Sequence, residues 1–357
     1  MKETLARAST SHVRIAADRS IGALEWWRHT LGHGGVNAVP LPDRVVKGVE
    51  KLKPRLVRIF LQEFFNIYNE QKQLDWSKLD PYMAALDRTG AKVVAAITIK
   101  PKVLFPTVDQ RIWQPTDVEE WQHVMYELVR RYSVEKPLVT HWEIGNETDI
   151  GENGGCPYLI RDPEAYAAFY EMTIDPVLRA YPAAKVGGPA SCWVENEPLP
   201  GLVRHCARTG TQLDFISWHI YNDNPERHAA GIRKAKEFLK AWPGRPPELF
   251  VTEWSKSFDS ISVEEQAFEP RRAALVAAII FGMLDAGVDW SFYYHIWDQV
   301  FYREPFRDFF SDSGLSLMVR HWNEVPHRFG LFGVDERVRP QYFVYQMLSR
   351  LGEERVE

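Results

Sequence analysis

The sequence is short of several features that would assign it to a common protein class. Its 357 residues carry a net charge of −5, with a pI of about 6.2, so it lacks the basic excess that nucleic acids and anionic membranes demand. No apolar run reaches the roughly 18 residues of a membrane span, and the most apolar segment, residues 273–287, contains Asp285 and is typical of a core helix. No GxGxxG motif follows an early strand, which argues against a dinucleotide-binding sheet.

Cysteine is scarce too, at three residues. Cys156, Cys192 and Cys206 form no CxxC pair, and their spacing does not suggest a zinc site. We expect free thiols, with a single Cys156–Cys192 or Cys192–Cys206 bridge as the alternative. The first residues contain no apolar stretch of a signal peptide, so a cytoplasmic protein is expected if Met1 is the natural start.

What the sequence does contain is a regular alternation of strand and helix patterns. Because each apolar, β-branched or aromatic run is followed by an amphipathic segment, the pattern predicts a parallel sheet of the α/β class. Eight such units favour a closed (β/α)8 TIM barrel, with a doubly wound open sheet as the alternative. The expected strands are residues 29–32, 56–60, 92–99, 138–144, 185–188, 215–221, 249–254 and 289–296. The helices are expected near residues 43–52, 79–86 and 121–132, from residue 163 onward, and near residues 198–209, 225–242, 264–286 and 340–351.

Local signals refine this scheme. Thr116 and Glu119 have the spacing of a capping box, and Asp162 with Pro163 has the pattern of an N-cap followed by a first-turn proline. Long insertions follow the third, fourth and eighth strands, at residues 101–115, 148–162 and 298–339. In a barrel, loops that follow strands lie on the catalytic face, so these loops are expected to shape a cleft.

Two carboxylates end predicted strands. Glu147 follows the fourth strand and Glu253 closes the seventh, each after apolar residues. Both positions face the mouth of a barrel, where two carboxylates can converge on one bond, as glycoside hydrolysis requires. The alternative interpretation is an ion pair or a strand-end cap. Arg58, inside the second strand, would need a buried anion, and Glu143, four residues before Glu147, is expected to supply it.

Polar and aromatic residues surround the same strand ends. His219 and Tyr221 lie two apart on the sixth strand and therefore share one face. Tyr293, His295 and Trp297 are expected to do the same on the eighth strand. Taken singly, each of these is more typical of a protein core than of a site, and their shared position favours the site.

The motifs GNE at residues 145–147, HIY at 219–221 and TEW at 252–254, with Trp297, resemble clan A glycoside hydrolases. The sequence is more closely similar to glycoside hydrolase family 39, which includes β-xylosidases and α-L-iduronidases. The likeness extends through residues 17–35, 56–60 and 339–352, and so covers nearly the whole chain.

This resemblance implies a retaining, double-displacement mechanism, with Glu147 as general acid/base and Glu253 as nucleophile. It implies that Asn146 bonds the sugar 2-hydroxyl, that Tyr221 orients Glu253, and that His219 bonds Glu147 or the sugar. Trp297 would form the floor of the subsite for the cleaved sugar, and Glu304 would bind sugar hydroxyls. His33 and Arg58 complete the expected substrate-binding set. No metal or organic cofactor is implied.

The sequence departs from the family in its outer domain. Members usually add a β-sandwich, which is expected here to be absent or reduced to a remnant strand, HVRIAAD (residues 12–18). Residues 1–20 are expected to form an N-terminal arm or strand and residues 21–357 the barrel. Lys100 could attract a uronate carboxylate, but a solvated loop lysine is the favoured interpretation. The oligomeric state is left open.

The expected substrate is a glycoside or an oligosaccharide, and β-xylosidase-like activity is the first hypothesis. An endo-acting polysaccharide hydrolase and an α-L-iduronidase-like enzyme are alternatives within the class. Two alternatives come from other classes. One is a non-catalytic carbohydrate-binding barrel, and the other is a metal-dependent hydrolase using His33, His219 and His295.

Overall fold

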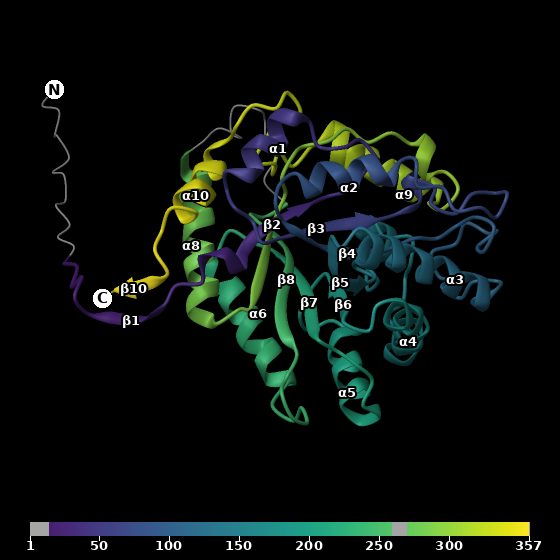
Figure 1. Ribbon diagram of the computed structural model, residues 1–357, viewed down its shortest axis with the longest axis horizontal. Coiled ribbons are helices and arrows are strands. Elements are labelled where there is room, and N and C mark those ends of the chain that lie inside the picture. Colours follow the sequence, from purple (N-terminus) through teal and green to yellow (C-terminus); the bar gives the residue numbers. More distant parts are fainter. Residues whose placement is uncertain (1–13, 259–269, 357) are drawn as a thin grey trace, which may run out of the picture.

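The chain folds into a closed barrel of eight parallel strands, β2 to β9, ringed by helices (Figure 1). The structure is a computed structural model that describes residues 14–258 and 270–356. Each barrel strand pairs with its neighbours in chain order, and β9 closes on β2, so the predicted (β/α)8 barrel is confirmed. The strands are β2 (His29–His33), β3 (Leu56–Leu61), β4 (Lys92–Ile97), β5 (Val139–Ile144), β6 (Lys185–Ser191), β7 (Phe215–Tyr221), β8 (Glu248–Ser255) and β9 (Trp290–Tyr294).

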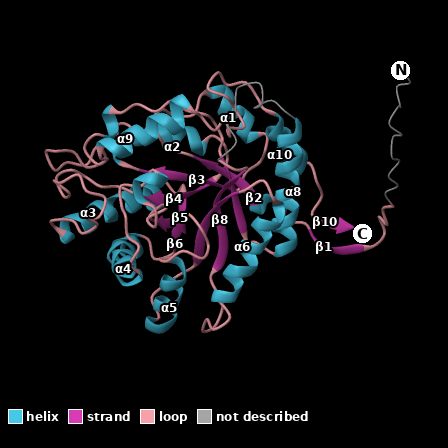
Figure 2. Cartoon of the chain, turned by 180° about the vertical axis from the view of Figure 1, so that it is seen from behind, coloured by secondary structure: helices cyan, strands magenta, loops and turns pink. Residues whose placement is uncertain are grey.

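The helices lie around the outside of the strands, as Figure 2 shows. Their apolar faces pack against the barrel, and Trp121, Trp142, Trp218 and Trp254 are almost completely buried in this layer. The helices are α1 (Asp43–Glu50), α2 (Leu79–Asp87), α3 (Val118–Val129), α4 (Pro163–Ala180), α5 (Leu199–Thr209), α6 (Pro225–Phe238), α8 (Pro270–Ala286), α9 (Asp312–Val319) and α10 (Pro340–Leu348). Shorter helical turns are η1 (Trp26–Arg28), η2 (Glu63–Phe65), η3 (Arg130–Glu135), η4 (Gly151–Gly154), η5 (Glu304–Phe306) and η6 (Arg320–Glu324).

Of the two helix N-caps predicted from the sequence, one is confirmed and one is wrong. Asp162 caps α4 by accepting the N–H of Ala165, with Pro163 in the first turn, as predicted. At α3 the cap is Asp117, which accepts the N–H of Glu120, so the Thr116 capping box was wrong by one residue. Asp is an equally good N-cap, and the Thr116 hydroxyl instead donates to a loop carbonyl. The predicted helix start at residue 264 lies outside the described residues.

A two-stranded sheet lies outside the barrel. Strand β1 (Ser20–Ala23) pairs antiparallel with β10 (Glu354–Val356), so segments from both ends of the described chain run side by side (Figure 1). The remnant strand expected at residues 12–18 is wrong where it can be checked, because residues 14–18 form no strand. Residues 12 and 13 lie outside the described part. Over the described residues, no helix has the length and apolarity needed to cross a lipid bilayer.

The barrel interior is layered, because alternate strand residues point inward. An apolar cluster of Leu56, Val94, Phe215, Phe250 and Phe292 fills the lower level. Two residues further along β3 comes Arg58, and the next inward position is Phe60. The apolar level closes the barrel below, and the charged level above it lies directly beneath the mouth.

A β-bulge in β8 sets the direction of Glu253. Strand β7 pairs Trp218 with Val251 and then His219 with Glu253, so Thr252 is an extra residue in β8. Phe250 belongs to the interior cluster, and simple alternation would therefore place Thr252, not Glu253, on the inner face. The bulge reverses that parity and aims Glu253 into the barrel.

Candidate active site

A buried arginine organises the polar residues at the barrel mouth. Arg58, only 1% exposed, donates Nε–H to Glu143 at 2.6 Å and Nη1–H to Glu253 at 2.7 Å. Its remaining Nη2–H donates to the side-chain oxygen of Asn146 at 2.7 Å. The predicted Arg58–Glu143 ion pair is confirmed, and the same guanidinium also fixes Glu253 and Asn146.

Glu147 lies just beyond β5 in an unusual backbone conformation. Its φ is 46°, in the left-handed region that side chains other than Gly and Asn rarely adopt. Backbone hydrogen bonds stabilise this conformation. The Glu147 N–H donates to the Ala190 carbonyl at 2.8 Å, and the N–H groups of Ile150 and Gly151 donate to the Glu147 carbonyl. Gly154 packs so closely on the Glu147 carboxyl that any side chain there would collide with it. Strained residues of this kind cluster at functional sites.

His219 links the two carboxyl groups. Its Nδ1 lies 2.8 Å from Oε1 of Glu147 and 3.7 Å from Oε2 of Glu253. Burial holds the pKa of His219 well below its ordinary value, and the Arg58 charge acts in the same direction. The imidazole is therefore neutral at physiological pH. Of the two partners predicted for it, Glu147 is the one it contacts.

The two carboxyl groups have different electrostatic surroundings. One oxygen of each lies within 4.8 Å of the other. Burial raises the pKa of Glu147 well above its ordinary value, and the charges of Glu253 and Asp149 add to this. Burial also raises the pKa of Glu253, but Arg58 and the Tyr221 hydroxyl, which donates to Oε2, oppose the rise. The proton therefore resides on Glu147 and the negative charge on Glu253.

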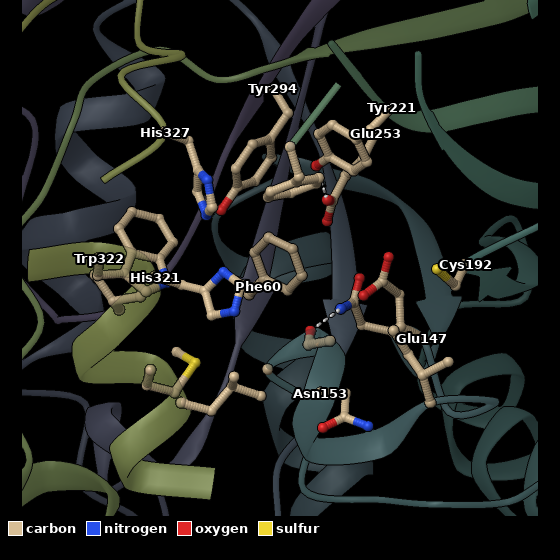
Figure 3. Close-up of a pocket in the computed structure, with 18 of the residues that line it drawn as sticks. Phe60, Glu147, Asn153, Cys192, Tyr221, Glu253, Tyr294, His321, Trp322 and His327 are labelled. Atoms are coloured by element: carbon tan, nitrogen blue, oxygen red, sulfur yellow. Dashed lines mark hydrogen bonds between the residues drawn. The ribbon is translucent and has the colours of Figure 1, made fainter. Parts of the chain in front are cut away.

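Both carboxyl groups line a cavity of about 320 Å³. Figure 3 shows Glu147 and Cys192 on one side of it, Glu253 and Tyr221 at one end, and Tyr294, Trp322, His321 and His327 opposite Glu147. Asn146 and Tyr221 also line the cavity, as predicted for substrate-binding residues. Arg58 and His219 lie behind this lining and reach it through the groups they bind.

Three predicted binding residues lie away from the cavity. Trp297 packs against the outer core, with its ring stacked on His33 at 6.4 Å between centroids. His33 is completely buried between aromatic rings, and burial lowers its pKa to about 3. Glu304 is exposed in η5 and lines a separate polar cavity with Lys100 and Lys102. The roles predicted for Trp297, His33 and Glu304 therefore find no support in the geometry.

The parity predicted for the eighth strand was wrong by one residue. Tyr294 points into the cavity, whereas Tyr293 faces outward and donates its hydroxyl to the Phe329 carbonyl. His295 is turned from the cavity and bonds Asp298 at 3.0 Å. Tyr294 fits because Gly34 faces its hydroxyl, where a side chain would collide with the ring.

Sequence reasoning also missed other lining residues. Phe60 shares the parity of Arg58 and could have been found from it. The residues from the segments that follow β6, β8 and β9 could not be placed by strand alternation; they are Trp193, Phe258, Leu317, Met318, His321, Trp322 and His327. The three cysteines are free thiols, as expected, and Cys192 hydrogen-bonds Glu147 within the cavity.

Lys100 is not a solvated loop lysine. It is 2% exposed, and its ammonium donates to the carbonyls of Asp109 and Pro157 at 2.8 and 2.9 Å. Burial lowers its pKa to about 8. It is absent from the lining of the cavity that holds Glu147, so it offers no attraction to a uronate there.

Within the described residues, the donor set that best matches a metal site is Glu147, His219 and Glu253. Arg58 already places a cation 2.7 Å from Glu253 and would repel a second one. His33 and His295 stack on each other at 6.4 Å, and neither belongs to this donor set. The arrangement therefore fits proton transfer and nucleophilic attack better than metal binding.

Comparisons with known proteins agree with this geometry. A family model described as "Glycosyl hydrolases family 39" matches residues 11–357. A β-xylosidase of Geobacillus stearothermophilus is 22% identical over 262 residues, covering 67% of this chain and 48% of the relative. A β-xylosidase of Caldicellulosiruptor saccharolyticus is 25% identical over 265 residues, covering 69% and 49%. The chain thus spans about half the length of these relatives.

A solved structure supports the fold in the same way. The structure of a family 39 β-xylosidase from Caulobacter crescentus superposes with a TM-score of 0.73 at 19% identity. The match covers 95% of this chain and 74% of that one. At this identity the likeness bears on the barrel alone.

The Arg58 contacts can be tested by substitution. Arg58→Met leaves Glu143 and Glu253 buried without a cation, so the free energy of unfolding should fall by about 3–5 kcal/mol. Adding Glu143→Gln removes one of the two unpaired charges and should recover part of that stability. Turnover should stay at least about 100-fold reduced in both variants, because Glu253 still lacks its guanidinium. Urea denaturation and steady-state kinetics measure the two effects. Near-normal turnover in the double variant would contradict the assignment of Arg58.

The raised pKa of Glu147 predicts a pH-dependent stability. The folded protein holds this proton more tightly than the unfolded chain, so stability should fall as the pH rises above the unfolded value of about 4.3. Glu147→Gln is neutral throughout and should melt at least about 2 °C higher than the wild type at pH 8. The gain should vanish towards pH 4. Calorimetry across this range, with the exposed Glu304→Gln as control, makes the test; an unchanged pH profile in Glu147→Gln would exclude the proton assignment.

Proposed function

The chain belongs to glycosyl hydrolases family 39, and from that premise we propose that it cleaves β-linked glycosides with retention of configuration by double displacement. The observation that carries the proposal is the pair of carboxyl groups. Glu147 and Glu253 have oxygens within 4.8 Å of each other, close to the separation of about 5 Å that retaining glycosidases use.

In the first step, a carboxylate oxygen of Glu253 attacks the anomeric carbon, and the bond from that carbon to the leaving oxygen breaks. Glu147 gives its proton to the leaving oxygen, so the aglycone departs as an alcohol. Arg58 and Tyr221 support this role by holding Glu253 ionised and aimed at the cavity. The product of the step is a glycosyl ester on Glu253.

In the second step, water attacks the anomeric carbon from the side that the aglycone has left. Glu147, now a carboxylate, takes a proton from this water, the ester bond to Glu253 breaks, and the starting protonation is restored. His219 supports both steps as a neutral partner 2.8 Å from Glu147, because it orients the carboxyl without competing for its proton at physiological pH.

Sugar hydroxyls need hydrogen-bond partners inside the cavity. Asn146, held by Arg58, supports the proposed bond to the 2-hydroxyl, a contact that strengthens in the transition state. His321 and His327 line the side opposite Glu147. Burial lowers the pKa of His327 to about 3, so it offers a neutral imidazole to the hydroxyls at physiological pH. These groups take over the part that the sequence suggested for Glu304.

We infer exo-acting β-xylosidase-like hydrolysis as the first choice of substrate class. The proteins named β-xylosidase among the relatives favour it, and Trp322 and His321 bound the cavity opposite Glu147. An α-L-iduronidase-like specificity is disfavoured, because no Lys or Arg occurs among the described residues that line the cavity. A non-catalytic sugar-binding barrel would have no use for two adjacent carboxyls with opposed electrostatic surroundings.

Azide distinguishes the two carboxyl roles. In Glu253→Ala, azide should enter from the nucleophile's side and convert an aryl β-glycoside into the inverted glycosyl azide. In Glu147→Ala, azide should attack the glycosyl ester on Glu253 and give the retained glycosyl azide. NMR spectroscopy determines the anomeric configuration of the glycosyl azide that each variant produces. Identical anomers from both variants would refute the assignment of the two roles.

Leaving-group dependence tests the acid role separately. Glu147→Gln should lower the rate on glycosides of poorly acidic alcohols by about 100-fold or more, because the leaving oxygen then lacks its proton donor. The first step on 4-nitrophenyl glycosides should change much less, since nitrophenolate leaves without protonation. Pre-steady-state kinetics of the first step give the comparison; equal losses on both substrates would argue against Glu147 as the acid.

A further inference from the structure

The leaving group must lie on the side of the cavity where Glu147 reaches the glycosidic oxygen. Three segments of the lining lead away from Glu147: its own loop, the loop after Cys192, and α9, which is reached through Gly154 and Gly155. Ile150 follows Glu147 on the same loop, and its N–H donates to the Glu147 carbonyl at 3.0 Å. Trp193 adjoins Cys192, whose thiol hydrogen-bonds Glu147. These contacts place both Ile150 and Trp193 beside the proposed acid.

The third segment is α9, whose Leu317 and Met318 also line the cavity. The Met318 sulfur lies 3.6 Å from the point where a side chain on Gly155 would begin, and Gly155 follows the Gly154 that packs on Glu147. We name the set Ile150, Trp193, Leu317 and Met318 the aglycone wall. All four line the cavity.

Two buried carboxylates hold the wall in place. Asp149 accepts the backbone N–H of Cys192 and the side-chain amide of Asn196 at 2.9 Å, which fixes the loop carrying Trp193. Glu152 accepts the N–H of Ser311 at 2.8 Å together with its hydroxyl, and Ser311 is the N-cap of α9. Each carboxylate is 4% exposed. The wall is therefore a preorganised surface.

We propose that this wall binds an apolar aglycone, so that the substrate is a glycoside of an aliphatic or aromatic alcohol. The inference rests on the proposed function. A second sugar would present several hydroxyls to the wall, where the Trp193 indole N–H is the sole polar group among the four side chains. Sugar hydroxyls left without partners against the wall would lose their hydrogen bonds to water and gain none from the protein, which costs binding free energy. Burial of an apolar aglycone is favourable.

The other polar side chains in this part of the lining are Asn153, Cys192, Gln62 and His321, and His321 is a group proposed above for the hydroxyls of the cleaved sugar. Asn153 is exposed at the mouth, and Cys192 is engaged with Glu147. Gln62 donates its side-chain N–H to the Gly155 carbonyl at 2.7 Å, and its buried oxygen, which has no hydrogen-bond partner among the described residues, is the one acceptor it could offer to a ligand. Trp193, 46% exposed, offers a flat apolar face towards solvent at which a larger aglycone can continue.

Alkyl glycosides provide the test. A panel of 4-nitrophenyl glycosides of xylose, glucose, galactose, arabinose and iduronic acid first identifies the sugar. Methyl, hexyl and octyl glycosides of that sugar are then compared with its disaccharide. Alkanols differ little in acidity, so a trend in kcat/KM reports binding of the chain in the transition state. Each fully buried methylene is worth up to about fourfold. We expect at least a tenfold rise in kcat/KM from methyl to octyl, and octyl above the disaccharide.

Variants locate the effect. Met318→Gln and Trp193→Ser should each reduce the octyl-to-methyl ratio of kcat/KM several-fold. Met347→Gln makes the same chemical change at a methionine that is 65% exposed on α10, and its ratio should equal that of the wild type. Because Trp193 is largely exposed, its substitution keeps the test valid if the buried Met318 variant does not fold.

The outcomes separate the two proposals. In one outcome the enzyme hydrolyses a 4-nitrophenyl glycoside but shows the same kcat/KM for the methyl, hexyl and octyl glycosides, or a higher kcat/KM for the disaccharide than for the octyl glycoside. Either result would overturn the proposal of an apolar aglycone and leave the proposal of a glycosidase standing. A rising series whose slope is unchanged in both wall variants would also overturn it. Absence of turnover on every aryl glycoside would overturn both proposals.

Discussion

The site depends on one guanidinium buried inside the barrel. Arg58 donates hydrogen bonds to Glu143, Glu253 and Asn146, each 2.6–2.7 Å long. A buried cation of this kind is costly unless it is fully paired, so the three acceptors must all be in place for the barrel to tolerate it. The residue that stabilises the interior therefore also fixes the group proposed to attack and the group proposed to bind the sugar. Stability and catalytic geometry are coupled through the same side chain.

Charge balance at this level explains why the two carboxyl groups differ. Arg58 supplies one positive charge, and Glu143 and Glu253 already contact it directly. Glu147 is a third buried carboxyl, and its nearest basic group is His219, which burial keeps neutral. Burial therefore favours the protonated form of Glu147, and this is the state that a general acid needs. The neighbour that keeps Glu253 ionised, as the proposed nucleophile must be, leaves the proton on Glu147, the proposed acid.

The sequence was informative wherever burial restricts which residue types are tolerated. Carboxylates and an arginine inside apolar strands had to be paired or used, so Glu143, Glu147 and Arg58 could be recognised from their context. The prediction of which residues of the eighth strand face inward was wrong because WSFYYHI (residues 290–296) is aromatic on both faces. Alternation therefore does not distinguish the inner face from the outer one. The Thr252 bulge was equally invisible, and Glu253 was found through its motif and not through its parity. Trp297 and Glu304, which the family resemblance suggested, lie outside the cavity lining; Glu304 was placed by its spacing from Trp297 within a long insertion, whose path no periodic pattern fixes.

The residues that the sequence predicted and those that it missed lie in different parts of the molecule. The strands carry the Arg58 contacts and the carboxyl pair, whereas the cavity walls come mainly from the insertions after β5, β6 and β9. The insertions also hold one another in place, since Glu152 joins η4 to α9 and Asp149 joins its loop to Cys192. A change at Leu317 or Met318 can thus alter what the cavity accepts without disturbing Arg58. The same barrel chemistry can serve different aglycones, and the residues that choose among them are those for which strand periodicity gives no guidance.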